Sequence, residues 1–161
     1  MNNNFKPIGF IGIGLMGASF VKRLSELNYL INAYDKRKEK LESLNNKKRV
    51  TLCANPAQVC KNCDIIFICV DKTENVKNVV FGDDGIIQNA SKDTIIVDLS
   101  TTLANETINF SKKIKIEKKS SWVDAPISGG PEKALDGSLA IMVGGEQKDV
   151  DIISPILNDI A

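Results

Sequence analysis

Three glycines near the start of the chain, Gly12, Gly14 and Gly17, have the spacing of a pyrophosphate-binding turn. They follow a short apolar run at 8–11 and directly precede a stretch in which apolar residues recur at helical intervals. In the strand–turn–helix motif that binds dinucleotides, the first glycine allows a tight turn and the second lets the pyrophosphate approach the backbone. The third lets helix and strand pack closely, and the amino end of the helix offers free N–H groups to the anion. We therefore predict a dinucleotide-cofactor site that includes Gly12, Ile13, Gly14, Leu15, Met16 and Gly17.

An acidic residue, Asp35, closes the next predicted strand, at 29–34. An acid about 20 residues beyond the glycines binds the ribose hydroxyls of NAD in this motif. Asp35 could instead only cap the next helix, after an ordinary glycine turn, but the complete order of elements favours the cofactor site. The neighbouring Arg37 and Lys38 could accept the 2′-phosphate of NADP, or simply form a solvated helix face. Because the Asp35 carboxylate would repel that phosphate, the sequence favours NAD over NADP.

Alternating strand and helix patterns must position these residues. Strand patterns occur at 8–11, 29–34, 50–52, 64–70 and 94–98. Helical patterns begin at Leu15 and occur at 36–44, 56–62, 71–80 and 103–116, with a turn-rich connection at 81–86. This order predicts an α/β fold of the Rossmann type, a doubly wound, mostly parallel sheet with helices on both faces. Ligands bind such sheets beyond the carboxyl ends of the strands, so 12–17, Asp35, 70–75 and 100–102 form the expected functional edge.

Length and composition bound the class of protein. The 161 residues suffice for one well-buried domain, and the 43% hydrophobic and 25% charged residues are typical of a soluble globular protein. A net charge of +1 gives no support for nucleic acid or an acidic membrane as a partner. The sequence has no apolar run of membrane-spanning length, and its Asn-rich start does not resemble a signal peptide. We expect a cytoplasmic protein with neither nucleic-acid nor membrane partners.

Four cysteines, at positions 53, 60, 63 and 69, raise the question of metal or redox chemistry. Cys60 and Cys63 form a C-x-x-C pair, but the pair precedes a strand, whereas a thioredoxin-like motif opens a helix after one. The chain has no histidine, so a zinc site would need all four thiolates, and Cys69 lies inside an apolar run. We predict cysteines that pack as small hydrophobes, and no metal site.

The segment 123–145, VDAPISGGPEKALDGSLAIMVGG, closely resembles the "DAPVSGG" and "MVGG" block of the 3-hydroxyisobutyrate (β-hydroxyacid) dehydrogenases. The start at 9–17, GFIGIGLMG, resembles that family's "GFIGLGxMG", and Asp98-Leu99-Ser100-Thr101 resembles its "D.ST" turn. The three motifs follow the family's order and spacing over the whole chain. The chain departs from the pattern at Asp71, where the family usually has proline, at 104–105, where proline is also frequent, at Ile127, usually valine, and at 132–133, where a glycine is common.

The resemblance implies roles for residues outside the glycine motif. Ser128, Gly129 and Gly130 would bind a substrate carboxylate, because successive N–H groups and one hydroxyl can form an anion-binding nest. The same residues could instead form only a structural turn. The resemblance also places Val70, Asp71, Asn75 and Thr101 beside the cofactor. Lys133 is the only lysine in the block, but it stands at the start of a predicted helix, and we assign it no catalytic role.

The resemblance implies an oxidoreductase that moves a hydride between a nicotinamide cofactor and a small 3-hydroxy acid. In that family a catalytic lysine lies in a long helix after the cofactor domain, and an all-helical domain follows. This places the expected lysine beyond Ala161, so we predict no catalytic residue within the 161 residues.

We therefore expect residues 1–161 to be a cofactor domain alone, inactive by itself, with an exposed apolar surface and with homo-oligomers formed only by the full-length protein. Three alternatives stay open: an imine reductase, an enzyme resembling 6-phosphogluconate dehydrogenase, and a non-catalytic dinucleotide-binding sensor or assembly module.

Overall fold

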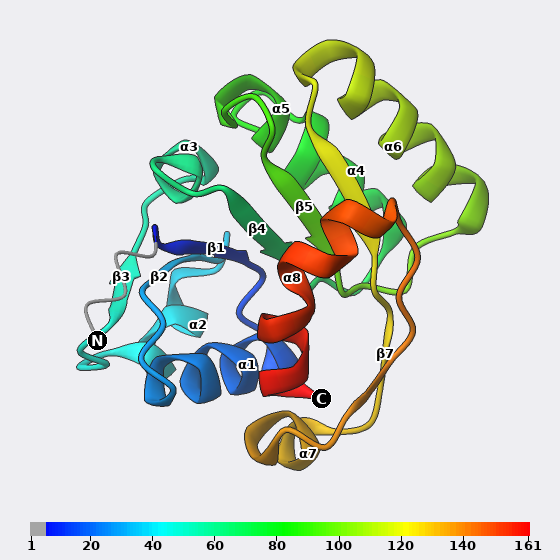
Figure 1. The fold of residues 1–161 in the computed structure, drawn as a ribbon. Helices are drawn as coiled ribbons and strands as arrows, with labels where there is room; N and C mark the ends of the chain where they lie inside the picture. The colour runs from blue at the N-terminus through cyan, green and yellow to red at the C-terminus, as the bar shows by residue number, and fades with distance from the viewer. Residues whose placement is uncertain (1–5) are drawn as a thin grey trace.

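A six-stranded parallel sheet runs through the middle of the molecule, in the order β3-β2-β1-β4-β5-β6 (Figure 1). The structure is a computed structural model, and it describes residues 6–161. The strands are β1 (Ile8–Ile11), β2 (Ile31–Tyr34), β3 (Val50–Leu52), β4 (Ile65–Ile68), β5 (Ile95–Asp98) and β6 (Ser121–Asp124). The chain first builds outward from β1 to β3, then returns to the other side of β1 with β4. The strand order therefore reverses between β1 and β4, where such sheets bind their ligands.

Helices cover both faces of this sheet (Figure 1). One face carries α1 (Leu15–Glu26), the short α2 (Lys38–Leu41) with a 3₁₀ turn η1 (Glu42–Leu44), and α8 (Gln147–Ile160). The other face carries α3 (Pro56–Cys60), α4 (Thr73–Phe81), α5 (Ile86–Asn89) and α6 (Ala104–Lys118).

Alternating side chains of the strands supply two separate cores. In β1, Phe10 packs in the core under α1 and α8, whereas Ile11 packs in the core under α3 to α6. Phe10 stacks on Phe67 of β4, with ring centroids 5.9 Å apart, and neither side chain is exposed. Parallel strands covered on both faces need apolar residues at nearly every position, which explains the continuous apolar runs of the sequence.

A smaller unit follows β6 and lies outside the main sheet. It consists of β7 (Ile127–Ser128), α7 (Pro131–Asp136) and β8 (Ala140–Ile141), with β7 and β8 paired antiparallel. We call residues 127–141 the β7–β8 segment. Its helix α7 lies next to α1 (Figure 1). The chain then returns to the sheet, where Gly144 and Asp124 form a single antiparallel bridge.

The predicted Rossmann-type fold is confirmed, and each predicted strand is present. Several predicted boundaries are wrong. Helix α4 begins at Thr73 and not at residue 71, the region 36–44 holds only one short helix and a 3₁₀ turn, and the connection at 81–86 leads into the short helix α5.

The patterns above do not include β6, the two-residue strands β7 and β8, or α8. Strands of two residues are too short to show a period. Helix α8 contains a proline at position 155, and an internal proline weakens a helical prediction. The helix nevertheless continues through Pro155 to Ile160.

Candidate cofactor-binding site

A pocket of about 480 Å³ opens at the carboxyl ends of β1, β2 and β4, between α1 and α4. Nine of the residues predicted to bind the cofactor line it: Gly12, Gly14, Leu15, Met16, Gly17, Asp35, Val70, Asp71 and Asn75. They come from the loops after β1, β2 and β4 and from the first turns of α1 and α4, and the strand order brings these segments together at the predicted edge of the sheet.

The three glycines differ in the space around them. Gly12 has φ +98°, and a methyl group on it would lie 2.2 Å from the carbonyl oxygen of Cys69 in the loop after β4. A methyl group on Gly17 would lie 1.9 Å from the carbonyl oxygen of Gly12, so the close packing of α1 on its loop requires glycine there. Around Gly14, by contrast, the place of a methyl group is empty to 4 Å. The backbone of the turn is thus tightly held at its two ends and open at its centre, where a ligand could approach it.

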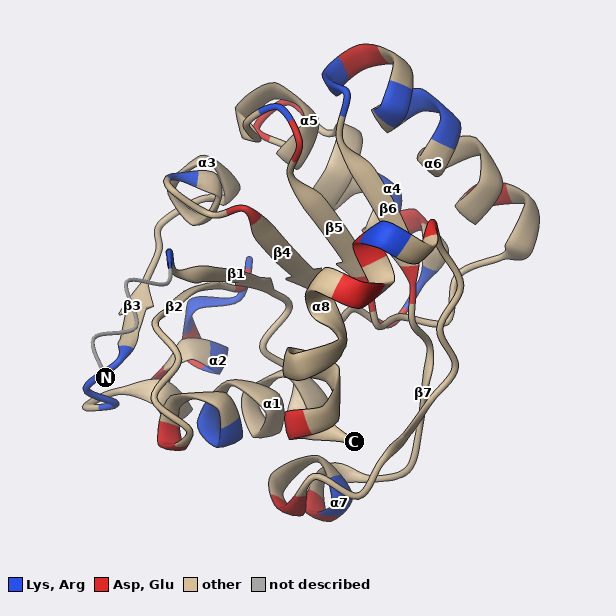
Figure 2. Cartoon of the chain, viewed as in Figure 1, with Lys and Arg blue, Asp and Glu red and all other residues tan. Residues whose placement is uncertain are grey.

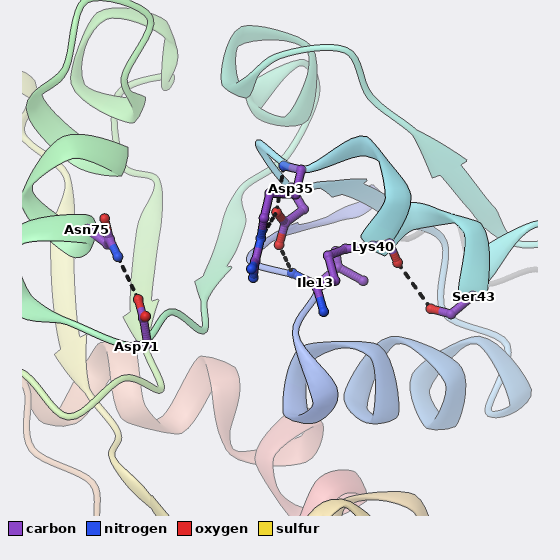
Figure 3. Close-up of polar contacts among 7 residues, drawn as sticks. Ile13, Asp35, Lys40, Ser43, Asp71 and Asn75 are labelled. Atoms are coloured by element: carbon purple, nitrogen blue, oxygen red, sulfur yellow. Dashed lines mark hydrogen bonds and ion pairs between the residues drawn. The ribbon is translucent and has the colours of Figure 1, made fainter.

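The carboxylate of Asp35 joins the ends of β1 and β2 (Figure 3). Its Oδ2 accepts the N–H of Ile13 at 2.8 Å, and its Oδ1 accepts the N–H of Arg37 at 2.9 Å. The Asp35 side chain is 10% exposed, whereas that of Arg37 is 58% exposed, with Nε 3.9 Å from Oδ1. Each carboxylate oxygen has a second lone pair, so Asp35 can brace the glycine loop and still accept bonds from a ligand.

The opposite wall of the pocket is formed by the loop after β4 and the start of α4. Asn75 donates from its amide nitrogen to Oδ1 of Asp71 at 2.5 Å (Figure 3), and this hydrogen bond lowers the pKa of Asp71. Ser100 holds the same loop from β5, because its hydroxyl oxygen accepts the N–H of Val70 at 3.0 Å. The pocket walls therefore carry two carboxylates together with the cations Lys36 and Arg37.

A second buried carboxylate, Asp98, orders the turn after β5. It accepts the N–H of Ser100 at 2.9 Å and the hydroxyl of Thr102 at 2.6 Å. Burial raises the pKa of Asp98, while the hydrogen bonds from Thr102 and Ser100 act in the opposite direction. Asp98 is fully buried, and its carboxylate accepts hydrogen bonds only from its own turn, so it acts as a positioning group for Ser100 and the Val70 loop.

Some predicted site residues lie outside the pocket wall. Ile13 is buried and reaches the site only through its backbone N–H. Thr101 is exposed and does not line the pocket, whereas its neighbours Ser100 and Thr102 make the side-chain hydrogen bonds of this turn. The residues at 128–130 belong to the β7–β8 segment, and they form no part of this pocket.

The structure adds pocket residues that the motifs did not predict: Tyr34, Lys36, Pro56, Cys69, Asn78 and Val79. Asn78 and Val79 stand three and four positions after Asn75 on α4, so helical periodicity could have placed them on the same face. Pro56 opens α3 directly after β3, where Asn55 caps the helix by accepting the N–H of Gln58 at 2.9 Å.

The cysteines lack the surroundings of a redox or metal site. All four are free thiols, and Cys53, Cys60 and Cys63 are buried. Burial raises the pKa of the Cys60 and Cys63 thiols to about 12, which disfavours the thiolate form that metals and disulfides need. Within residues 6–161 there is no cluster of three or more His, Cys, Asp or Glu side chains suited to a metal ion.

Charged residues of both signs occur on α6 and at the start of α8 (Figure 2). None of the helices in the described part of the chain is long and apolar enough to cross a membrane. The expected cytoplasmic location stays a prediction.

The switch point of the sheet, the constrained glycine turn and the acid at the end of β2 together define a dinucleotide-binding domain of the Rossmann type. Residues 7–161 match the family model described as the NAD binding domain of 6-phosphogluconate dehydrogenase, and the chain belongs to this family. It is thus a nicotinamide-dinucleotide-binding domain of the kind found in oxidoreductases.

Individual relatives agree with this assignment. The chain is 35% identical over 153 residues to the uncharacterized oxidoreductase YkwC of Bacillus subtilis, a match that covers 95% of this chain and 52% of YkwC. It is 29% identical over 156 residues to the probable mitochondrial 3-hydroxyisobutyrate dehydrogenase-like 3 of Arabidopsis thaliana, covering 95% of this chain and 48% of that protein. The crystal structure of a putative oxidoreductase from Mycobacterium avium superposes with a TM-score of 0.88 at 30% identity, over 98% of this chain and 55% of that one. The chain therefore spans about half the length of each of these three relatives.

Proposed function

We propose that this chain is the cofactor domain of an NAD-dependent dehydrogenase that acts on a small 3-hydroxy acid. The observation that carries the proposal is the combination of an open backbone at Gly14 with a braced carboxylate at Asp35 in one pocket. The turn from Gly12 to Gly17 would hold the pyrophosphate, and Asp35 would accept hydrogen bonds from the adenosine ribose. When bound, the nicotinamide supplies the hydride acceptor.

The pocket residues can bind this cofactor, but they do not supply every group that the reaction needs. A dehydrogenase also needs a general acid–base for the hydroxyl proton. Lys133, the one lysine in the segment 123–145, is exposed on α7 and lines no part of the pocket. The one lysine on the pocket wall, Lys36, directly follows Asp35 and so stands at the end assigned to the adenosine ribose.

The catalytic lysine is therefore assigned to a part of the whole protein beyond Ala161. This assignment rests on the resemblance to the 3-hydroxyisobutyrate dehydrogenases, and it remains a prediction. The same resemblance supports a helical domain in that further part, which would make the contacts of a homo-oligomer.

The substrate carboxylate is assigned to the turn Ser128–Gly129–Gly130. Ser128 and Gly129 are exposed, and Gly129 has φ +138°, a conformation that side-chain-bearing residues rarely adopt. A small acid could thus approach both the hydroxyl of Ser128 and the free backbone of the turn.

Calorimetry on residues 1–161 tests the first half of the proposal. We expect NAD to bind, and we expect no sustained hydride transfer from 3-hydroxy acids because the proposed acid–base is assigned to a position beyond Ala161. Absence of NAD binding up to about millimolar concentration, a Kd that corresponds to roughly −4 kcal/mol, would refute the cofactor site. Steady turnover by this chain would refute the assignment of the base to a position beyond Ala161.

The substrate assignment needs a separate measurement. With NAD bound, 3-hydroxybutyrate should shift the backbone NMR signals of Ser128, Gly129 and Gly130, and 3-hydroxybutyramide, which lacks the negative charge, should not. Equal shifts with acid and amide would show that the turn does not recognise a carboxylate. Ser128→Ala should raise the Kd of 3-hydroxybutyrate by about fivefold, because it removes one hydrogen bond that contributes about 1 kcal/mol.

A further inference from the structure

Arg23, near the end of α1, links that helix to two others. Its Nη1 donates to the carbonyl oxygen of Leu135 in α7 at 3.0 Å, and its Nε donates to the carbonyl oxygen of Asp159 in α8. The Leu135 carbonyl lies in the last turn of α7, where carbonyl groups lack partners within the helix and carry partial negative charge. One guanidinium group thus joins α1 to the backbones of α7 and α8.

The guanidinium also fills the space beside the turn that ends α7. A methyl group on Gly137 would lie 2.2 Å from Nη2 of Arg23, and Gly137 has φ +74°. The N–H groups of Gly137 and Ser138 both donate to the carbonyl oxygen of Lys133, at 2.9 and 3.0 Å. The end of α7 is therefore closed by its own backbone on one side and by Arg23 on the other.

Helix α7 in turn fixes the proposed carboxylate turn. Residues 128–130 directly precede α7, and the space beside Gly129 is filled by the helix and by the residue that leads into β8. A methyl group on Gly129 would lie 2.5 Å from Cδ2 of Leu139 and 3.2 Å from Cδ of Lys133. A shift of α7 along α1 would consequently move the turn with it.

Helix α1 connects the two sites physically. Its first residue, Leu15, belongs to the glycine turn, and Arg23 lies two helical turns later on the same rigid element. Among residues 6–161, Arg23 forms no ion pair, and both of its hydrogen bonds go to backbone carbonyl groups. The contact therefore depends on the forked geometry of arginine, which a lysine ammonium group cannot reproduce.

We propose that Arg23 is a positioning residue that holds the β7–β8 segment on α1, and so sets the place of the carboxylate turn relative to the bound dinucleotide. The carboxylate part of this inference rests on the proposed function. The positional part rests on the contacts of Arg23 alone.

Hydrogen exchange of the backbone, measured by mass spectrometry on residues 1–161, tests the positional part. Arg23→Gln should speed exchange in 127–141 by about tenfold, with no comparable change in β1, β4 and β5, because only the local opening of this segment becomes easier. Arg23→Lys, which keeps the charge and loses the fork, should lie between Arg23→Gln and the unsubstituted protein. The matched control is Lys22→Gln on the same helix, whose side chain makes no hydrogen bond or ion pair within the described residues.

Ligand titrations test the coupling. Arg23→Gln should change the Kd of NAD by less than about threefold, since the glycine turn is untouched. In the presence of NAD, the same substitution should raise the Kd of 3-hydroxybutyrate by about tenfold. A merely structural role would lower the affinity for both ligands together. If Arg23→Gln is too unstable to study, Arg23→Lys carries the same comparison.

Three results would overturn the inference: unchanged exchange in 127–141, faster exchange spread evenly over the main sheet, or faster exchange in 127–141 with unaltered 3-hydroxybutyrate affinity. Failure of the proposed function looks different, because the unsubstituted protein would then bind no 3-hydroxybutyrate at all. The exchange comparison would still decide whether Arg23 positions the segment.

Discussion

Cofactor choice should depend on the charge of Asp35, whose carboxylate oxygens lie in the pocket, 2.8 and 2.9 Å from the backbone nitrogens of Ile13 and Arg37. A 2′-phosphate on the adenosine ribose would stand next to this carboxylate. Two unit charges about 4 Å apart interact by roughly 1 kcal/mol in bulk water and about 4 kcal/mol near a protein surface. Arg37 attracts the same phosphate, but its side chain is 58% exposed, and exposed ion pairs contribute only about 0–1 kcal/mol. We therefore expect NAD to bind at least about tenfold more tightly than NADP, a difference of roughly 1.4 kcal/mol.

Two substitutions separate the charge of Asp35 from its bracing role. Asp35→Asn removes the charge but keeps the size and one acceptor oxygen, and so keeps one of the two backbone hydrogen bonds. The ratio of the two affinities should therefore fall to within about threefold, mainly through better binding of NADP. Asp35→Ala should also narrow the ratio. In addition it leaves the buried N–H of Ile13 without an acceptor, at a cost of about 1–3 kcal/mol, so both cofactors should bind more weakly and the domain should unfold more easily.

The assay is a pair of calorimetric titrations, with NAD and with NADP, at about 0.15 M salt, where screening over about 8 Å leaves the short contact intact. Asp71→Asn is the matched control, because it removes a charge from the opposite wall without touching the glycine turn. It should leave the ratio within about twofold of the unsubstituted value. Equal affinities in the unsubstituted protein, or a ratio that Asp35→Asn does not move, would show that another residue selects the cofactor.

Three further outcomes follow from the geometry. Gly17→Ala should lower the free energy of unfolding by about 3 kcal/mol or more, because the added methyl group would lie 1.9 Å from the Gly12 carbonyl oxygen. Gly14→Ala should change the free energy of unfolding by less than about 1 kcal/mol and should instead weaken NAD binding. Equal denaturation midpoints for the two variants would contradict this. Ser100→Ala removes the acceptor of the Val70 N–H and should cost about 1–3 kcal/mol in urea denaturation, against little change for the exposed Thr101→Ala. Burial holds the pKa of the Cys60 and Cys63 thiols at about 12, so the folded state keeps protons that the unfolded chain releases above about pH 8.5. The free energy of unfolding should therefore fall as the pH rises from about 9 toward 12. Cys60→Ala with Cys63→Ala should reduce that alkaline loss, and rapid alkylation of both thiols in the folded protein at pH 8 would contradict the burial.

The main sheet could be predicted from sequence because each buried strand carries its own signal. In β4, for example, Ile66, Phe67 and Ile68 are all fully buried, and a run of this kind needs no knowledge of its neighbours. The short elements lack such a signal. Strands β7 and β8 have two residues each and are stable only because they pair with one another and because α7 packs on α1. Their existence depends on contacts between segments more than 100 positions apart, which no local period records.

The same distinction divides the site residues. The glycine turn is restricted locally: Gly12 needs its positive φ, and Gly17 needs the absence of a side chain next to Gly12, so their spacing alone indicates where an anion could approach. Asp35 has two roles of which sequence predicts one, since its brace to Ile13 exists only after β1 and β2 have paired in register.

The role of Arg23 is the least predictable from sequence. Its partners, Leu135 and Asp159, contribute only backbone carbonyl groups, which every residue has, so no pattern of side chains could reveal them. The contacts of such a residue can be identified only once the positions of the helices are known. Its effect on the carboxylate turn must be measured with both ligands in the same protein, because only the comparison separates a positional effect from a general loss of affinity.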